Sequence, residues 1–267
     1  MLEPGHASRN YWGDLWRYRE LMYFLAWRDI VVRYKQTAIG VAWALLRPAA
    51  TMLVFIAFRR LAGIPSGTAP EPVLVFAAVL PWQFFSAALT ESSASLIGNA
   101  NLISKVYFPR LIIPSAAVVT SLVDFAITLG LLAALMLWYG VAPGWELLAL
   151  PMFVLLAIAL ALGVGVWLAA LNVEYRDFRY IVPFVVQFGL FVSPVAFTLS
   201  RVPEQWRTLY ALNPMVGIIE GFRWSVLGKG ATLDLEAVAL SVIVTSSALF
   251  LGVRYFRRME RSFADVI

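Results

Sequence analysis

The sequence contains no cysteine and only one histidine, His6. Without cysteine there can be no disulfide bond and no thiolate ligand, and one imidazole cannot form a zinc cluster or a histidine-based acid–base pair. GxSxG and HExxH motifs are also missing, and Gly228-Lys229-Gly230 lacks the earlier glycine and the following hydroxyl residue of a P-loop. We therefore expect no enzyme activity, no resident cofactor and no metal site in this chain.

Charge is scarce as well. Asp, Glu, Lys and Arg make up 14% of the 267 residues, 61% are hydrophobic, and the mean hydropathy is +0.79. Soluble domains have roughly 25% charged and 45–50% apolar residues, so this composition predicts a protein that crosses a membrane several times. The net charge of +5 does not predict a nucleic-acid partner, because the basic residues border apolar segments instead of forming a stripe with aromatic residues.

Six apolar segments predict an all-α membrane domain that occupies the whole chain, 1–267. The expected spans are residues 39–58, 73–97, 111–139, 146–171, 181–199 and 236–256. Pro48 is expected to break the first span near its start, and Arg47 beside it to reach the near headgroups with its long side chain. Pro183 and Pro194 are expected to kink the fifth span without ending it.

Two further regions predict helices that do not cross the membrane. Residues 10–36 place Trp12, Trp16, Tyr23 and Trp27 on one side of a helix, which predicts an amphipathic helix in the plane of the membrane interface; packing against another protein is the alternative. Residues 202–230 contain two apolar runs that are too short to cross, separated by Asn213-Pro214, and predict two re-entrant helices.

Charge bias predicts the orientation. Six spans place both termini on one side, and 15 of the 21 Lys and Arg residues lie on that side or close to it. The positive-inside rule therefore places both termini in the cytoplasm. The segment between the second and third spans, residues 99–110, is then cytoplasmic as well.

This segment is too polar for a bilayer core and too apolar for an ordinary hydrated loop. Leu102, Ile103, Val106 and Tyr107 fall on one side at helical spacing, so we expect the segment to present a face to another molecule. Its string Ile103-Ser-Lys-Val-Tyr-Phe-Pro-Arg110 closely resembles the first cytoplasmic loop of ABC-2 type permeases of the O-antigen and polysaccharide exporter family. Three other strings match the same family in order and spacing: 172–180, 211–215 and 219–224.

The resemblance implies a homodimer in the inner membrane that works with two copies of a separate ABC ATPase, on which ATP and Mg bind. The implied cargo is a lipid-linked polysaccharide of the O-antigen type, with a capsular polysaccharide or teichoic acid as alternatives. Seven residues would couple to the ATPase: Leu102, Ile103, Lys105, Val106, Tyr107, Phe108 and Arg110. Tyr107 and Phe108 are expected to be the buried anchors of that contact, and Lys105 and Arg110 its charged rim.

By the same resemblance, the re-entrant region closes the outer end of the channel, with Asn213, Pro214, Glu220 and Arg223 as candidate gate residues. Polar side chains recur along one side of the second span. The candidate channel-lining residues are Phe55, Trp82, Gln83, Phe85, Ser86, Thr90, Glu91 and Asp124.

The carboxylates of Glu91 and Asp124 leave two interpretations open, because an ionisable residue inside a membrane marks either a transport site or an interhelical hydrogen bond. A proton-coupled secondary transporter would use them as relays, but the two halves of the chain show no matching pair of interrupted spans. A membrane-embedded glycosyl or lipid transferase would need a charged cluster at the interface, and the loops carry only scattered single charges.

Overall fold

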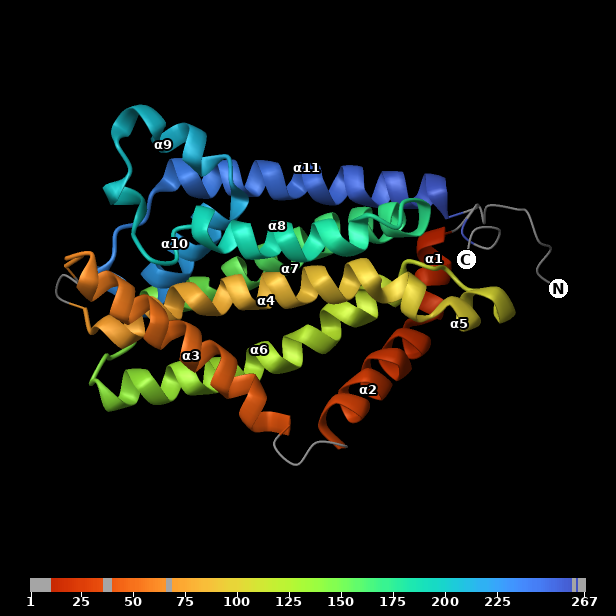
Figure 1. The fold of residues 1–267 in the computed structure, drawn as a ribbon, viewed down its shortest axis with the longest axis horizontal. Coiled ribbons are helices and arrows are strands. Elements are labelled where there is room, and N and C mark those ends of the chain that lie inside the picture. The colour runs from red at the N-terminus through yellow and green to blue at the C-terminus, as the bar shows by residue number, and fades with distance from the viewer. Residues whose placement is uncertain (1–10, 36–39, 66–68, 261–262, 264–267) are drawn as a thin grey trace.

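The structure is a computed structural model that describes residues 11–35, 40–65, 69–260 and 263, and within these ranges all regular elements are helices (Figure 1). The α-helices are α1 (Tyr11–Arg17), α2 (Arg19–Lys35), α3 (Gly40–Leu61), α4 (Glu71–Gly98), α5 (Ala100–Lys105), α6 (Ile112–Trp138), α7 (Leu150–Glu174), α8 (Phe178–Val192), α9 (Glu204–Ala211), α10 (Pro214–Leu227) and α11 (Leu235–Met259). Short 3-10 helices occupy Trp145–Ala149, Leu199–Arg201 and Gly228–Gly230. The expected first residues of the interface helix, 10, and of the first span, 39, lie outside the described residues.

Five helices are long and apolar enough to cross a membrane, which confirms the all-α membrane class. They are α3 from Ala42, α4, α6, the continuous Trp145–Glu174 segment that includes α7, and α11. Each coincides with an expected span. The predicted break at Pro48 is wrong, because α3 continues through this proline.

The predicted fifth span, residues 181–199, is not confirmed. It corresponds to α8, which has 15 residues and ends at Val192. At about 1.5 Å per residue, α8 is roughly 22 Å long, whereas a hydrocarbon core is about 30 Å thick. Pro183 lies inside α8 as expected, but Pro194 ends the helix instead of kinking it. The residue before a proline avoids the helical conformation, and Ser193 is extended, with φ −90° and ψ 154°.

The core is built around α4, which lies between α6 and α7 and is buried along most of its length. Small residues allow the close approach of its neighbours. A Cβ added at Gly165 of α7 would lie 2.7 Å from the Ser92 hydroxyl oxygen of α4, and a Cβ added at Gly163 would lie 2.6 Å from the Leu249 backbone of α11. Helix α7 is thus packed closely against α4 on one side and α11 on the other.

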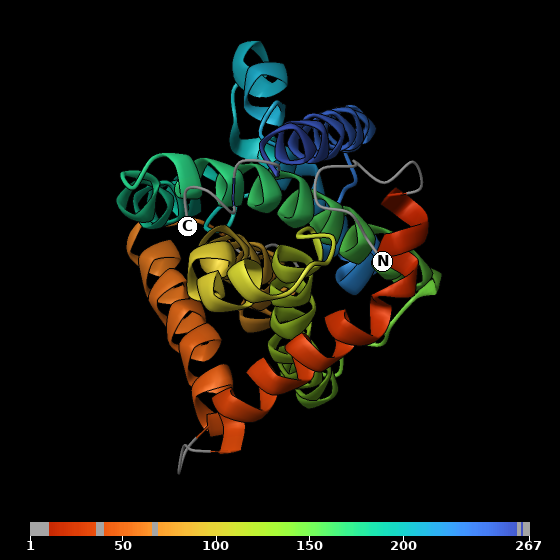
Figure 2. The ribbon, with the colours of Figure 1, turned by 90° about the vertical axis from the view of Figure 1, so that its right-hand side faces the viewer.

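Helices α2 and α3 form two sides of the molecule when it is viewed from the right-hand side of Figure 1 (Figure 2). Helix α2 crosses α6 and packs on it with Leu25 and Ala26, which are buried. The rings of Tyr23 and Trp27 remain exposed on the opposite face, as an interface helix requires. Its location in a membrane interface stays a prediction.

Two short helices occupy the region predicted to be re-entrant. Helix α9 is largely exposed, whereas α10 is buried against α4, α7 and α11. Asn213 begins α10: its side-chain oxygen accepts from the Met215 N–H at 3.0 Å, and Pro214 occupies the first turn, where no N–H is needed. The predicted corner is therefore a capped helix start; its depth in the membrane stays a prediction.

Candidate coupling segment and polar cavity

The segment between α4 and α6 contains one short helix, α5, followed by extended backbone at Val106 (φ −129°, ψ 133°). Val106 and Tyr107 are exposed, with 49% and 58% of their surface accessible, whereas Phe108 is 3% exposed. The outer surface of this segment is therefore formed by Val106 and Tyr107.

The prediction that Phe108 is a docking anchor is wrong, because its ring lies in the protein's own core. It belongs to a buried cluster that includes Leu25 of α2, Ile112 of α6 and Phe256 of α11. Ile103 is in the same cluster and Leu102 packs partly against it, while Lys105 is exposed. Phe108 and Ile103 hold the segment to the bundle from within.

Arg110, which was expected to be a rim charge of the ATPase contact, is bound to the chain's own Glu260. Its backbone N–H donates to the Glu260 carboxylate at 2.7 Å, and its guanidinium donates to the Glu260 carbonyl oxygen. The guanidinium also lies over the ring of Phe263, 5.9 Å from its centroid. Burial raises the pKa of the carboxyl of Glu260, the residue that directly follows α11. Arg110 thus fastens the end of the coupling segment to the end of α11.

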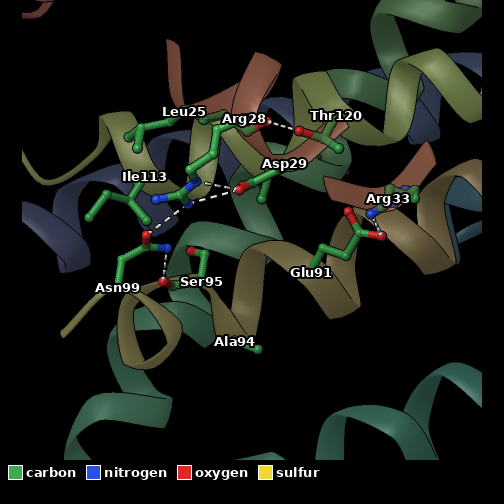
Figure 3. A pocket seen from close by; sticks show the side chains of 12 residues that line it. Leu25, Arg28, Asp29, Arg33, Glu91, Ala94, Ser95, Asn99, Ile113 and Thr120 are labelled. Atoms are coloured by element: carbon green, nitrogen blue, oxygen red, sulfur yellow. Dashed lines mark hydrogen bonds and ion pairs between the residues drawn. The ribbon is translucent and has the colours of Figure 1, made fainter. Parts of the chain in front are cut away.

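The start of the segment is fastened to α2. The Asn99 side-chain oxygen accepts from the Arg28 guanidinium at 3.0 Å, and the Asn99 amide donates to the Ser95 carbonyl at 2.9 Å (Figure 3). Arg28 also pairs with Asp29 on its own helix, at 2.8 Å. The segment that contains the exposed Val106–Tyr107 pair is therefore attached to α2 at its start and to the end of α11 at its own end.

Arg33 of α2 pairs with both intramembrane carboxylates. Its guanidinium donates to Glu91 of α4 at 2.6 Å and to Asp124 of α6. The Tyr34 hydroxyl also donates to Asp124, and the Ser121 hydroxyl lies 3.0 Å from the second Glu91 oxygen. The two carboxylates thus join α2 to the bundle.

Sequence reasoning did not assign a role to Arg33 or Tyr34. The available signal was the pair of carboxylates itself, since a carboxylate inside an apolar span requires a cationic or hydrogen-bonding partner.

A cavity of about 530 Å³ lies beside Arg33, between α2, α3, α4 and α6. Its polar and aromatic lining consists of Arg33, Tyr34, Trp43, Arg47, Gln83, Phe84, Glu91, Ser121, Asp124, Phe125 and Thr128. A smaller cavity of about 220 Å³ lies near Arg28, Asn99 and the same Arg33–Glu91 pair (Figure 3). Three of the expected channel-lining residues, Gln83, Glu91 and Asp124, therefore line one cavity.

The other expected channel residues lie elsewhere. Phe55, Trp82 and Phe85 are 5–9% exposed and belong to the main hydrophobic core of the single chain; that these rings line a channel stays a prediction. Trp82 packs so closely on α8 that a Cβ at Gly189 would lie 2.7 Å from its ring. Ser86 and Thr90 are half-buried, and the Thr90 hydroxyl donates to the Ser86 carbonyl.

Glu220 and Arg223, two of the four expected external gate residues, form a buried network around the segment after α8, whereas Asn213 and Pro214 are partly exposed. Arg223 is 1% exposed and donates to Glu220 at 2.9 Å, to the Phe197 carbonyl at 2.9 Å and to the Val195 carbonyl at 2.8 Å. Arg59 of α3, 2% exposed, donates to the Ala196 carbonyl at 2.7 Å. Arg59 thus satisfies the loop carbonyls of Ala196 and Pro65.

In the described part of the chain, no three His, Cys, Asp or Glu side chains are grouped so as to hold a metal ion. The polar groups that do come together are arginines, carboxylates, amides and hydroxyls from different helices. They can form ion pairs and bind polar or anionic groups.

Comparison with known proteins agrees with this architecture. Residues 20–227 match the ABC-2 type transporter family. The chain is 30% identical over 259 residues to an O-antigen export system permease protein, RfbA, of Myxococcus xanthus, covering 95% of this chain and 98% of that protein. It is 24% identical to the protein of the same name from Klebsiella pneumoniae, over 93% of this chain and 95% of that one. The polysialic acid transport protein KpsM of Escherichia coli is 25% identical over 88% of this chain and 92% of its own length. The chain therefore belongs to the ABC-2 type transporter family.

Proposed function

We propose that this chain is the membrane-spanning permease of an ATP-driven exporter that moves a lipid-linked polysaccharide of the O-antigen type across the cytoplasmic membrane. The names of its relatives, O-antigen export and polysialic acid transport, support a glycan cargo. A capsular polysaccharide or a teichoic acid fits the same family. Five long apolar helices support a multi-pass membrane location.

The observation that carries the proposal is the exposed Val106–Tyr107 pair, which lies in a segment attached to the bundle at both ends. The sequence has no nucleotide-binding motif of its own, so ATP with its Mg would bind to a separate ATPase chain. The work of hydrolysis would then cross a protein–protein contact. In such contacts a few aromatic or arginine anchors carry most of the binding energy. Tyr107 is exposed and its chain neighbour Phe108 is held in the core, which suits Tyr107 to be the anchor.

Co-purification with the ATPase tests this assignment. Tyr107→Ala should leave the permease inserted, because the ring is not part of the core, and should weaken ATPase binding by about 30-fold if the anchor contributes about 2 kcal/mol. Tyr139→Ala is the matched control, since this exposed tyrosine follows α6 at the opposite end of the bundle. Equal recovery of ATPase with wild type and Tyr107→Ala, from equal amounts of inserted protein, would contradict the docking assignment.

We propose further that two copies form the permease, each with an ATPase subunit. Helix α8 supports this: Phe184, Phe188 and Phe191 are 61–68% exposed, and only Val182 of the helix is buried. A short helix with an exposed aromatic face would bury that face by packing against a second copy of the chain. The absence of native cysteine makes the test direct, because a single Phe188→Cys variant should form a cross-linked dimer in native membranes. Phe250→Cys, on the exposed side of α11, is the control, and cross-linking no greater than in this control would contradict a dimer through α8.

The proposed orientation has both termini in the cytoplasm, supported by the excess of Lys and Arg toward that side. It places Val106 and Tyr107 where a cytoplasmic ATPase can reach them. A reporter fused after Ile267 should read as cytoplasmic; an external signal would overturn the orientation and the docking assignment together.

A further inference from the structure

Arg47 differs from every other charged residue of the 530 Å³ cavity. Arg33, Glu91 and Asp124 are bound to one another. Within residues 11–35, 40–65 and 69–260, the Arg47 guanidinium takes part in no hydrogen bond or ion pair, although it is exposed on the cavity. It lies in the second turn of α3, inside a helix apolar enough to span a membrane. A cation at this position is costly unless it meets water, a headgroup or an anion.

The surroundings of Arg47 combine two kinds of recognition surface. Trp43 lies one turn earlier on α3, so its ring and the guanidinium share one face of the helix, and the ring is 57% exposed at the cavity. A guanidinium binds phosphate oxygens with two parallel hydrogen bonds, and an indole offers a flat face on which a sugar ring can stack. The cavity volume lies within the usual range of about 300–1,000 Å³ for small-molecule sites.

The charges in the cavity give a ligand one orientation. Arg33 is shared by two carboxylates, so that wall has no cation to spare for an anionic group and would repel one. The same carboxylates, with the Thr128 hydroxyl, can accept or exchange hydrogen bonds with uncharged hydroxyl groups. Negative charge therefore fits beside Arg47, and neutral hydroxyl groups fit toward Glu91 and Asp124.

We propose that this cavity binds the junction between phosphate and sugar in a lipid-linked glycan, with the phosphate on Arg47 and the first sugar ring over Trp43. The proposal rests on the proposed function and names the residues that would recognise its substrate. A phosphate at this depth could also belong to an ordinary bilayer phospholipid. The exposed Trp43 ring and the hydroxyl-binding wall favour the glycan carrier, because a phospholipid headgroup would leave both without a partner.

Binding measurements on the purified permease in lipid nanodiscs test the assignment. The probes are a prenyl diphosphate that carries a disaccharide, the same prenyl diphosphate without sugar, and phosphatidylglycerol. Arg47→Gln should weaken both prenyl diphosphates about tenfold or more, because a hydrogen-bonded charge partner is lost, and Arg47→Lys should restore part of the affinity. Trp43→Ala should weaken only the probe with sugar. Arg60→Gln, an exposed arginine paired with Glu71 at the other end of α3, should change neither.

The outcomes separate this proposal from the function on which it rests. If Arg47→Gln loses affinity for phosphatidylglycerol and for the prenyl diphosphates equally, the cavity is a general headgroup site and the glycan assignment is overturned. Unchanged affinity for every probe in Arg47→Gln would mean that Arg47 only balances the carboxylate charges, which also overturns it. If the wild-type permease binds neither prenyl diphosphate, the proposed function fails with it; if wild type binds and only Arg47→Gln is without effect, the function stands.

Discussion

Arg33→Gln removes the one cation that serves both intramembrane carboxylates. Glu91 would keep its contact with the Ser121 hydroxyl and Asp124 its contact with Tyr34, but two neighbouring carboxylates would face each other without a counter-charge. We expect the variant to lose stability and α2 to separate from the bundle, since these contacts join α2 to α4 and α6.

The size of the loss in unfolding free energy follows from how exposed the three side chains are. Exposed ion pairs contribute about 0–1 kcal/mol, and removal of one partner from a fully buried pair costs about 3–5 kcal/mol. The side chains of Arg33, Glu91 and Asp124 are 28–31% exposed, which places this cluster between the two limits. A cost of about 2 kcal/mol is therefore expected for Arg33→Gln, or a decrease of about 4–8 °C in the unfolding midpoint for a chain of this size.

Thermal unfolding in detergent and hydrogen exchange of the α2 amides measure the global and the local effect. Arg33→Gln combined with Asp124→Asn should be more stable than Arg33→Gln alone, because one unpaired charge is removed. Arg28→Gln is the control on the same helix: its side chain is 42% exposed, so less than about 1 kcal/mol should be lost. An unchanged midpoint together with unchanged α2 exchange in Arg33→Gln would refute the assignment of Arg33 as the link between α2 and the bundle.

Asp124→Asn alone should keep export activity in cells, since an amide still accepts hydrogen bonds from Arg33 and Tyr34; loss of export in a folded variant would favour a proton relay. Phe108→Ala should cost about 3–5 kcal/mol in unfolding free energy, because the ring is 3% exposed, and a variant as stable as wild type would contradict its place in the core. Gly221→Ala should lower the yield of folded protein, measured by size-exclusion chromatography, since the new Cβ would lie 2.0 Å from the Phe153 ring. Burial raises the folded-state pKa of Glu260 above its ordinary 4.5, so its contribution to stability is present below that pH and is lost as pH rises. Unfolding midpoints of Glu260→Gln should therefore improve relative to wild type between pH 5 and 8, and a constant difference would contradict the raised pKa.

Hydropathy was sufficient to find the helices that are long enough to cross a membrane, because about 20 apolar residues in sequence are a strong local signal. The end of α8 at Val192 was also within reach of sequence, had the restriction that Pro194 places on Ser193 been given more weight than the apolar run. Pro48 shows the opposite error, because this proline sits within an unbroken α3. Local rules thus predict which residues can end a helix, while packing decides which of them do.

Tyr107 and Phe108 show where helical spacing stops predicting which side chains are exposed. Helical spacing placed Leu102, Ile103, Val106 and Tyr107 on one face, and this pattern holds only as far as α5 extends. The helix ends at Lys105 and the backbone is extended at Val106, so helical spacing no longer applies: Tyr107 is exposed and Phe108 is buried. Two adjacent aromatic residues cannot be told apart by composition; the backbone beyond the end of the helix decides which one faces outward.

Arg33 could not be chosen from its neighbours by charge alone, because Arg28 and Lys35 lie on the same helix. Its partners are 58 and 91 residues away in the sequence, so no local pattern joins them. The face of α2 does identify it: Ala26 is buried against the bundle, and Arg33 follows seven residues later, two turns along the same face. The exposed rings of Tyr23 and Trp27 mark the other face of the helix. Once those rings are assigned to the membrane interface, the face that contains Ala26 must meet the protein, and Arg33 is the cation that it brings to Glu91 and Asp124.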